Sequence, residues 1–259
     1  MRAVSIHTDA LVLTSRIWQT NAVALRAGSE AMLVDSPYLP DELGLLPAVL
    51  DQAGFKIDAL LATHADFDHL LGRMAFPGLA LGVGEPTMLR LRTEPGAAQR
   101  ELRDFDAELY VKRDSPLALG QVQSLPVPGV VELGDQEVEL HPADGHTADG
   151  TALLAPWLGV LIAGDYLSDV EIPMISPGGS LGDYQATLAR LAPLIERAET
   201  IVPGHGSALG RADAMRVLEE DASYLTTLSQ GQDKVRLPAG RESVRQRQIH
   251  TDNVAACSA

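Results

Sequence analysis

The stretch Thr63-His64-Ala65-Asp66-Phe67-Asp68-His69 decides the fold of this chain. It places two imidazoles and two carboxylates within six positions, directly after a run at 57–62 that is apolar except for Asp58. The run predicts a buried strand, and a loop leaving a strand can turn several side chains inward. Imidazole and carboxylate together suit zinc, iron or manganese. The segment therefore predicts a metal site; taken alone, it leaves open a solvated acidic loop that happens to contain two histidines.

Three later segments share one feature, a metal-type ligand beside glycine at the end of an apolar β run. They are Gly145-His146-Thr147, Ala163-Gly164-Asp165-Tyr166-Leu167 and Pro203-Gly204-His205-Gly206. Glycine allows backbone to approach a neighbouring group closely. Four independent accidents of this kind are improbable, so the ordered set favours one shared site.

With Asp35, which ends the run at 31–34, these segments resemble the five ordered motifs of the metallo-β-lactamase superfamily. The resemblance covers roughly residues 10 to 210. It implies an α/β fold, a four-layer αβ/βα sandwich of two mixed β-sheets with helices on the outer faces and a metal site at one edge. We expect a single metallo-β-lactamase-like domain over residues 1–259, with its core at about 10–210 and a C-terminal helix and tail at 211–259.

Apolar periodicity predicts a matching order of elements. Strands are expected at 10–17, 21–26, 31–34, 57–62, 137–140, 151–154, 159–163 and 200–202, and helices at 40–52, 85–110, 181–198 and 211–228. Pro126, Pro128 and Gly129 predict a loop or a frayed sheet edge at 122–131. The last thirty or so residues are expected to be peripheral. The alternation of strands and helices indicates two sheets packed face to face with helices outside.

The first metal of the resembled family would be held by a set that includes one unusual residue. The implied ligands are His64, His146 and Asp165, with Asp66 in the place of a usual histidine. The family pattern is His-x-His-x-Asp-His, whereas this chain has His-x-Asp-x-Asp-His. The third motif departs as well, reading Gly-His-Thr-Ala-Asp-Gly at 145–150 where Gly-His-Thr-Pro-Gly is more usual. The second departure is expected to alter the loop rather than the ligand.

The second metal would be held by Asp68, His69, His205 and the bridging Asp165, as the resemblance implies. Asp68 is also the expected catalytic residue, which orients the nucleophile or carries a proton to the leaving group. Asp35 would order the loop that carries the ligands without itself touching a metal. For Asp35 alone, an aspartate that caps a turn after a strand is the alternative.

Asp66 changes the charge of such a centre. Two divalent ions bring +4 and three aspartates bring −3, which leaves about +1, against about +2 with histidine at position 66. A less positive centre acidifies bound water less, and harder oxygen ligation shifts preference toward manganese or iron. We expect two divalent ions, with zinc first and iron or manganese as alternatives because of Asp66. A single metal at the second position is the alternative if Asp66 is too short to reach the first.

Composition and net charge restrict the classes of partner and the compartment that can be expected. The chain of 259 residues carries 20 Lys and Arg against 35 Asp and Glu, a formal net charge of -15, which disfavours nucleic acid. The one cysteine, Cys257, allows no internal disulfide and indicates a reducing compartment. Without a signal-like start or a stretch approaching 18 apolar residues, a cytoplasmic protein with no membrane partner is expected. The oligomeric state is not readable, and a homodimer is the common default.

The resemblance implies a hydrolase that uses a metal-bound hydroxide on a small ester-type substrate, a lactone, a thioester or a related ester. No Gly-x-Ser-x-Gly or Gly-x-x-x-x-Gly-Lys motif competes with this interpretation. Two alternatives stay open: an iron-dependent redox enzyme, flavodiiron-like or dioxygenase-like, and a non-catalytic metal-binding protein. Flavodiiron proteins place glutamate where this chain has Asp66. The substrate-binding residues are unknown, and residues 85–130 and 168–180, with Ile172, Met174 and Ile175, are the segments expected to wall the site.

Overall fold

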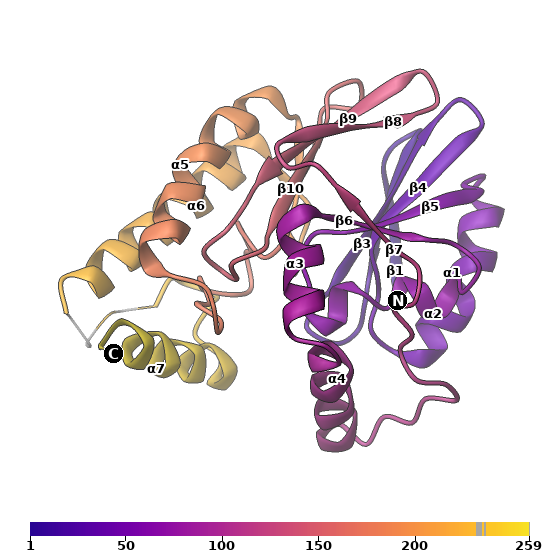
Figure 1. The fold of residues 1–259 in the computed structure, drawn as a ribbon. Coiled ribbons are helices and arrows are strands. Elements are labelled where there is room, and N and C mark those ends of the chain that lie inside the picture. The colour runs from indigo at the N-terminus through magenta and orange to yellow at the C-terminus, as the bar shows by residue number, and fades with distance from the viewer. Residues whose placement is uncertain (232–234, 236, 259) are drawn as a thin grey trace.

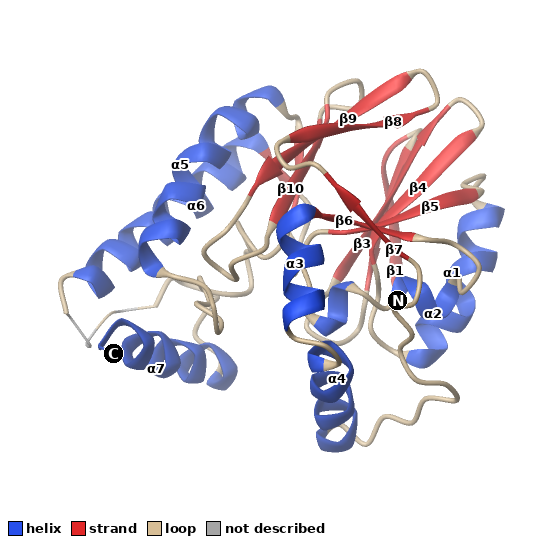
Figure 2. Ribbon diagram, viewed as in Figure 1, coloured by secondary structure: helices blue, strands red, loops and turns tan. Residues whose placement is uncertain are grey.

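The computed structural model describes residues 1–231, 235 and 237–258, and its two β-sheets pack face to face between layers of helices (Figures 1 and 2). One sheet has seven strands in the order β1 to β7, and the other has six in the order β13-β12-β11-β10-β9-β8. The helices α5 (Leu181–Arg197) and α6 (Arg211–Ser229) cover the second sheet, and α1 (Pro40–Gln52) and α2 (Gly72–Ala75) lie outside the first (Figure 1). The predicted four-layer α/β class is confirmed.

The first sheet combines an antiparallel meander with parallel strands. Its strands are β1 (Arg2–His7), β2 (Ala10–Thr14), β3 (Asn21–Ala27), β4 (Glu30–Asp35), β5 (Ile57–Ala62), β6 (Leu81–Gly84) and β7 (Val122–Leu125). The first four pair antiparallel, and β4 to β7 pair parallel. Parallel strands end at the same edge of a sheet, so the segments after β4 and β5 emerge side by side.

The second sheet, formed by the other half of the chain, also combines antiparallel with parallel strands. Its strands are β8 (Gly129–Leu133), β9 (Gln136–Pro142), β10 (Thr151–Ala155), β11 (Val160–Ile162), β12 (Thr200–Val202) and β13 (Leu209–Gly210). The strands β8 to β11 pair antiparallel, and β11 pairs parallel with β12. The segments that follow β11 and β12 therefore also meet at one edge.

The helices fill the outer layers and the two ends. They are α1 (Pro40–Gln52), the short 3-10 helix η1 (Phe67–His69), α2 (Gly72–Ala75), α3 (Glu85–Thr93), α4 (Ala97–Glu108), α5 (Leu181–Arg197), α6 (Arg211–Ser229) and α7 (Val244–Ser258). The expected helix at 85–110 is in fact two helices. They separate at Pro95 and Gly96, where proline disfavours the helix and Gly96 has a φ of 76°.

Alternation along the strands divides the buried side chains among three cores. In β3, Val23 and Leu25 point between the sheets, where they belong to the same cluster as Val138 of β9. The neighbours Ala22 and Ala24 point the other way, toward the helices. A period of two produces this division, because successive side chains of a strand face opposite sides of the sheet.

The structure also differs from the sequence prediction at residues 122–131 and 2–7. Residues 122–131 form two strands, β7 and β8, which lie at the edges of different sheets, so only the edge placement was right. Edge positions tolerate the prolines between these strands, since a missing N–H there breaks no ladder. The strand β1 was not expected at all, because residues 2–7 are mostly exposed and carry little apolar pattern.

The C-terminal region is not peripheral as expected. Arg241, Gln246 and Asn253 are buried, and Ile249 packs into the core beside α5 and α6. The polar side chains of Arg241, Gln246 and Asn253 form hydrogen bonds with the backbone of the loop at 168–175. These hydrogen bonds explain why the three polar side chains can be buried.

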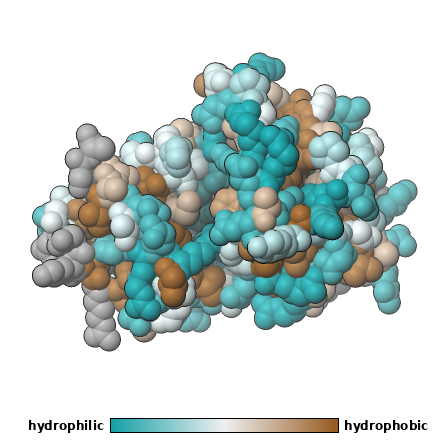
Figure 3. All heavy atoms as spheres, turned by 90° about the horizontal axis from the view of Figure 1, so that it is seen from below, coloured by the Kyte–Doolittle hydropathy of each residue, from teal (hydrophilic) through white to brown (hydrophobic). Residues whose placement is uncertain are grey.

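One face of the molecule can be judged for its polarity. Figure 3 views the molecule from below, and hydrophilic side chains predominate on that face, with smaller hydrophobic groups among them. Within the described residues, no helix combines the length and the apolar character needed to span a membrane.

Candidate metal centre

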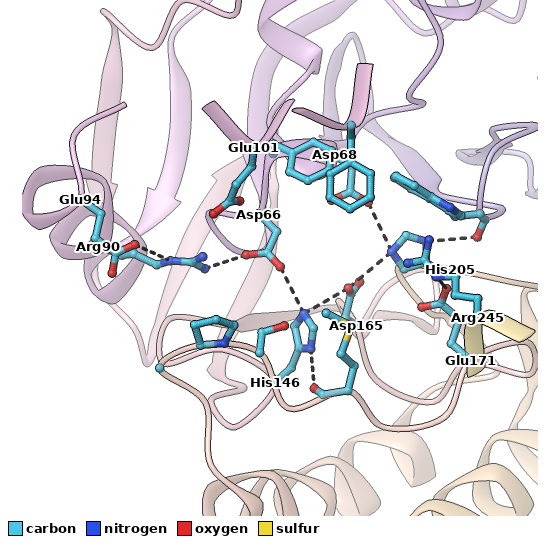
Figure 4. A pocket seen from close by; sticks show the side chains of 17 residues that line it. Asp66, Asp68, Arg90, Glu94, Glu101, His146, Asp165, Glu171, His205 and Arg245 are labelled. Atoms are coloured by element: carbon cyan, nitrogen blue, oxygen red, sulfur yellow. Dashed lines mark hydrogen bonds and ion pairs between the residues drawn. The ribbon is translucent and has the colours of Figure 1, made fainter. Parts of the chain in front are cut away.

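Segments far apart in the sequence meet at the edge where β4, β5, β11 and β12 end. The structure brings together all seven residues expected as ligands. They are His64, Asp66, Asp68, His69, His146, Asp165 and His205. Except for Asp66 and Asp165, which are partly exposed, these residues are buried. In Figure 4, Asp66 lies between Arg90 and His146, and Asp165 lies between His146 and His205.

The spacing of the first set fits a divalent ion. His146 Nε2 lies 3.4 Å from Asp66 Oδ2 and 3.3 Å from Asp165 Oδ2, and His64 Nε2 lies 3.6 Å from Asp66 Oδ2. Four ligand atoms bound at about 2.0–2.1 Å in a tetrahedron lie about 3.4 Å from one another. Both Nε2 atoms are buried and have no hydrogen-bond partner among the described residues. Unpartnered buried nitrogens at this spacing are the donor set that a metal ion needs.

A second set lies on the other side of Asp165. His205 Nε2 lies 3.5 Å from Asp68 Oδ2 and 3.4 Å from Asp165 Oδ2. His69 Nε2 lies 3.8 Å from Asp68 Oδ2 and 3.1 Å from Asp165 Oδ1. Asp165 therefore borders both sets, which is the position that a bridging carboxylate requires.

The opposite ring nitrogen of each imidazole lies against an oxygen atom, through a hydrogen bond in His64, His146 and His205 and through an ion-pair contact in His69, so Nε2 faces the centre. The partner atoms of Nδ1 are Thr63 Oγ1 for His64 at 3.0 Å, Asp35 Oδ2 for His69 at 3.0 Å, the Met174 carbonyl for His146 at 2.7 Å and the Trp18 carbonyl for His205 at 3.1 Å. Such partners select the tautomer and the ring orientation of metal-binding histidines.

Asp35 has the contacts that its expected ordering role requires. Its two carboxylate oxygens accept hydrogen bonds from the backbone N–H and the hydroxyl of Thr63, at 2.8 and 2.9 Å. It has a φ of 58°, which is uncommon for a residue with a side chain. Asp35 thus ties the start of the 63–69 segment to His69 and keeps its own carboxylate away from the centre of the cluster.

The charges of the cluster strongly perturb one another. Burial opposes ionisation of Asp66 and Asp165, but the neighbouring imidazoles hold the pKa of each carboxyl well below its usual value. Burial also disfavours the charged imidazoles, yet nearby carboxylates, Asp165 among them, raise the pKa of His146 to about 9 and that of His205 to about 10. The same balance raises the pKa of His69 well above its usual value. Without a metal ion, the imidazoles of His69, His146 and His205 therefore hold protons on the nitrogens that a metal ion would bind.

Metal binding is expected to release about three protons per chain near neutral pH, one from each of these three imidazoles, because a ligand nitrogen must be unprotonated. Since the shifted pKa values lie above neutrality, metal affinity should rise as the pH rises through about 9 and 10 and should fall toward acid. Calorimetric titration with zinc in buffers of different ionisation enthalpy measures the proton count. A binding enthalpy that is independent of the buffer would contradict the expectation.

Gly204 allows the last motif to approach the centre. A Cβ at this position would overlap Asp165 Oδ1 and would lie 3.0 Å from His69 Cε1. The surrounding backbone is held in place, because the Asn21 N–H donates to the Gly204 carbonyl at 2.7 Å and the Asn21 side chain donates to the Pro203 carbonyl at 2.9 Å. The chain therefore has little freedom to move away from an added methyl group.

Gly204→Ala is accordingly expected to displace Asp165 and to weaken metal binding by roughly 10- to 100-fold, the size typical of disturbed support around a metal site. Gly182→Ala on α5, where a Cβ meets open space, is the matched control. Chelator competition measures both variants. Equal affinities of Gly204→Ala and the wild type would contradict the steric argument.

A cavity of about 340 Å³ opens over the cluster. Trp18, Phe67 and Phe105 line one side of it, with ring centroids 5.2 Å apart for Trp18 and Phe105 and 5.0 Å apart for Phe67 and Phe105. Met174 and Pro177 line another side. The site thus combines a polar floor with walls that are aromatic on one side and elsewhere include charged side chains.

The segments expected to wall the site contribute in part. The loop at 168–180 supplies Met174 to the cavity, whereas Ile172 is buried in the core and Ile175 faces a different hollow beside α7. Residues 85–130 supply a mixed set: Arg90, Glu94, Glu101 and Phe105.

Several site residues were not expected from the sequence. Trp18, Arg245 and Asp149 are among them: the first two line the cavity, and Asp149 accepts a hydrogen bond from the Ala65 N–H. The one local signal among these three was the unusual Ala-Asp-Gly of the third motif, which contains Asp149.

Comparisons with known proteins agree with this geometry. Residues 16–205 match the family model described as the metallo-beta-lactamase superfamily. An acyl-coenzyme A thioesterase MBLAC2 from Gallus gallus is 27% identical over 223 residues, covering 80% of this chain and 79% of the relative, and the Bos taurus protein of that name is 26% identical over 224 residues, with the same coverage.

Solved structures show the same fold. A metallo-beta-lactamase family protein from Thermus thermophilus matches with a TM-score of 0.69 at 20% identity, covering 87% of this chain and 82% of that one. A metallo-beta-lactamase from Pontibacter korlensis matches with a TM-score of 0.65 at 19% identity, covering 87% and 98%. At these identities the likeness concerns the fold.

Proposed function

This chain belongs to the metallo-β-lactamase superfamily, and from that premise we propose that it is a metal-dependent hydrolase of small thioesters. The observation that carries the proposal is the set of unpartnered Nε2 atoms facing carboxylates at the floor of a cavity that has aromatic rings along one side. The relatives named as acyl-coenzyme A thioesterases favour a thioester over a lactone among the ester-type substrates that the sequence suggested.

In this proposal, His64, Asp66 and His146 hold one divalent ion, and Asp68, His69 and His205 hold another. Asp165 is shared between them. Zinc is the first choice, because imidazole nitrogen and carboxylate oxygen at tetrahedral spacing suit it, and the carboxylates also allow iron or manganese. Bound divalent ions would supply polarisation of a substrate carbonyl and acidification of water.

Asp68 is the proposed proton carrier. Its carboxylate lines the cavity and lies beside both His69 and His205. A carboxylate at this boundary can take a proton from attacking water and pass it to the departing sulfur. The backbone at Asp68 is held by the Ser36 hydroxyl, which donates to the Asp68 carbonyl at 3.2 Å.

The acyl portion of the substrate is proposed to lie against Trp18, Phe67 and Phe105, where apolar surface is removed from water. The cavity volume of about 340 Å³ is at the small end of ligand sites, which suits a short acyl group. The polar part of the substrate would then lie against charged side chains that also line the cavity, on the Arg90 and Glu94 side or on the Arg245 side.

The test is a substrate panel on protein stripped with a chelator and reloaded with zinc. Short acyl thioesters, a lactone and a phosphodiester are compared, with Asp68→Asn and the exposed control Asp104→Asn. We expect metal-dependent thioester hydrolysis that Asp68→Asn lowers by about 100-fold or more and Asp104→Asn leaves unchanged. Fully loaded protein that hydrolyses none of these esters would contradict the proposal. Bound iron with an oxygen-dependent spectrum would favour the redox alternative instead.

A further inference from the structure

One guanidinium joins the two positions at which the sequence departs from the family pattern. Arg90 Nη1 donates to Asp66 Oδ1 at 2.8 Å and to Asp149 Oδ1 at 2.9 Å. Asp66 stands in place of a usual histidine, and Asp149 belongs to the unusual Ala-Asp-Gly of the third motif. In Figure 4, the Arg90 side chain reaches Asp66 from the side opposite His146. The two departures are therefore parts of one contact.

The contact is built into the fold. The Asp149 side chain is 1% exposed, and those of Arg90 and Asp66 are 16% and 19% exposed. Asp149 Oδ2 also accepts the Ala65 N–H at 2.8 Å, and the Asp149 carbonyl accepts the Thr87 hydroxyl at 2.8 Å. Asp149 thus fixes α3, which carries Arg90, against the segment that carries Asp66.

The two oxygens of Asp66 face different partners. Oδ1 is held by Arg90, whereas Oδ2 lies 3.4 Å from His146 Nε2 and 3.6 Å from His64 Nε2. A carboxylate restrained in this way offers one atom to the centre, as an imidazole does when its other nitrogen is anchored. Arg90 does not simply neutralise the charge at this place, because its one positive charge faces the two negative charges of Asp66 and Asp149. The orientation of Asp66 is what Arg90 determines.

We propose that Arg90, braced by Asp149, is a positioning residue that makes Asp66 a one-oxygen ligand of the first metal ion. This inference rests on the proposed two-metal centre. Without Arg90, the Asp66 carboxylate can rotate or engage through both oxygens, and the first ion binds more weakly. The hydrogen bonds and ion pairs described for Arg90 go to Asp66, Glu94 and Asp149, so the second ion, expected at Asp68, His69 and His205, should bind as before.

The experiment measures zinc affinity by chelator competition and zinc content per chain at buffered free zinc. Arg90→Met is compared with Arg92→Met, which removes an exposed arginine from the same helix. We expect one of two ions to bind roughly 10- to 100-fold more weakly in Arg90→Met and both ions to bind unchanged in Arg92→Met. Cobalt substitution adds a second readout, since the absorption spectrum of the first site should change with its coordination.

A second background separates positioning from a general structural role. The comparison of Arg90→Met with Arg92→Met is repeated in protein that carries Asp66→His. In both backgrounds, with Asp66 or with histidine at this position, Asp149→Asn is added, so that the removal of Arg90 leaves no unpaired charge at position 149. The asparagine side chain can still accept the Ala65 N–H. With histidine at position 66, Arg90→Met should change zinc affinity by less than about 3-fold, because an imidazole has no second oxygen to restrain. If Arg90→Met does not fold, Arg90→Lys replaces it in the same comparison.

The outcomes are distinct. Wild-type protein that binds fewer than two ions overturns the two-metal proposal and this inference with it. Wild-type protein with two ions and an Arg90→Met variant with unchanged affinities overturns the positioning role alone. An equal loss with Asp66 and with His at position 66 overturns it as well, because the effect would not pass through Asp66.

Discussion

Asp165→Ala is expected to lose both metal ions and to lower hydrolysis by on the order of 10³-fold or more, the loss that follows removal of a central catalytic group. The reason is its shared position. Asp165 Oδ2 lies 3.3 Å from His146 Nε2 in the first set and 3.4 Å from His205 Nε2 in the second. Its removal takes one ligand from each ion and leaves the imidazoles to repel one another when protonated.

Elemental analysis and initial-rate assays on the same preparation check this result. Asp104→Asn on α4, an exposed aspartate, controls for the loss of a carboxylate elsewhere. Circular dichroism shows whether each variant is folded at the assay temperature. An Asp165→Ala variant that keeps two ions, or that keeps turnover within about 10-fold of the wild type, would contradict the bridging assignment.

Arg241→Met is expected to lower the free energy of unfolding by about 3–5 kcal/mol, the cost of removing one partner from a buried ion pair. The Arg241 side chain is 1% exposed, and its guanidinium pairs with the Asp221 carboxylate and lies 2.8 Å from Glu220 Oε2. It also donates to the carbonyls of Ser168 and Glu171. The substitution leaves the Asp221 carboxyl and two carbonyls without their donor. For a chain of this size, the melting temperature should fall by about 10 °C.

Arg216→Met is the matched control. Arg216 also pairs with Glu220, but its side chain is 55% exposed, so its removal should change the melting temperature far less than the removal of Arg241. Thermal unfolding by calorimetry measures both variants, and adding Asp221→Leu to Arg241→Met should restore part of the loss. A melting temperature of Arg241→Met within about 2 °C of the wild type would show that the buried pair does not support the fold.

Arg241→Met should also weaken metal binding at the cluster. Arg241 holds the beginning of the loop at 168–175, while Gln246 and Asn253 of α7 bind the backbone of Ile172 and Ile175 farther along it. This loop carries the Met174 carbonyl that orients His146. The C-terminal region therefore acts on the site by fixing the loop, although it supplies none of the seven clustered side chains.

The residues of the cluster could be predicted because their side-chain types and their positions after apolar runs are visible in the sequence. His64 to His69 follow a strand without interruption, and His146, Asp165 and His205 each stand beside a glycine. Strand ends at one sheet edge bring such residues together without any further information. The strands at 57–62, 151–154 and 200–202 and the helices at 40–52 and 181–198 followed from their apolar patterns.

The supporting groups could not be predicted, because tertiary packing selects them. The anchors of His146 and His205 are backbone carbonyls, of Met174 and Trp18, and a carbonyl has no signature in the sequence. Arg90 could be placed on a helix, but not opposite Asp66 and Asp149, which are 24 and 59 residues away along the chain. The buried polar residues of the tail have the composition of a solvated surface, and only their backbone partners at 168–175 explain their burial.

Anomalous diffraction from zinc-loaded crystals tests the central claim most directly. We predict two peaks per chain, one among His64, Asp66 and His146 and the other among Asp68, His69 and His205, with the Asp165 carboxylate between them. Crystals that are loaded with zinc and yet show no peak at this cluster would contradict the account, because the side chains would then converge for some reason other than binding metal.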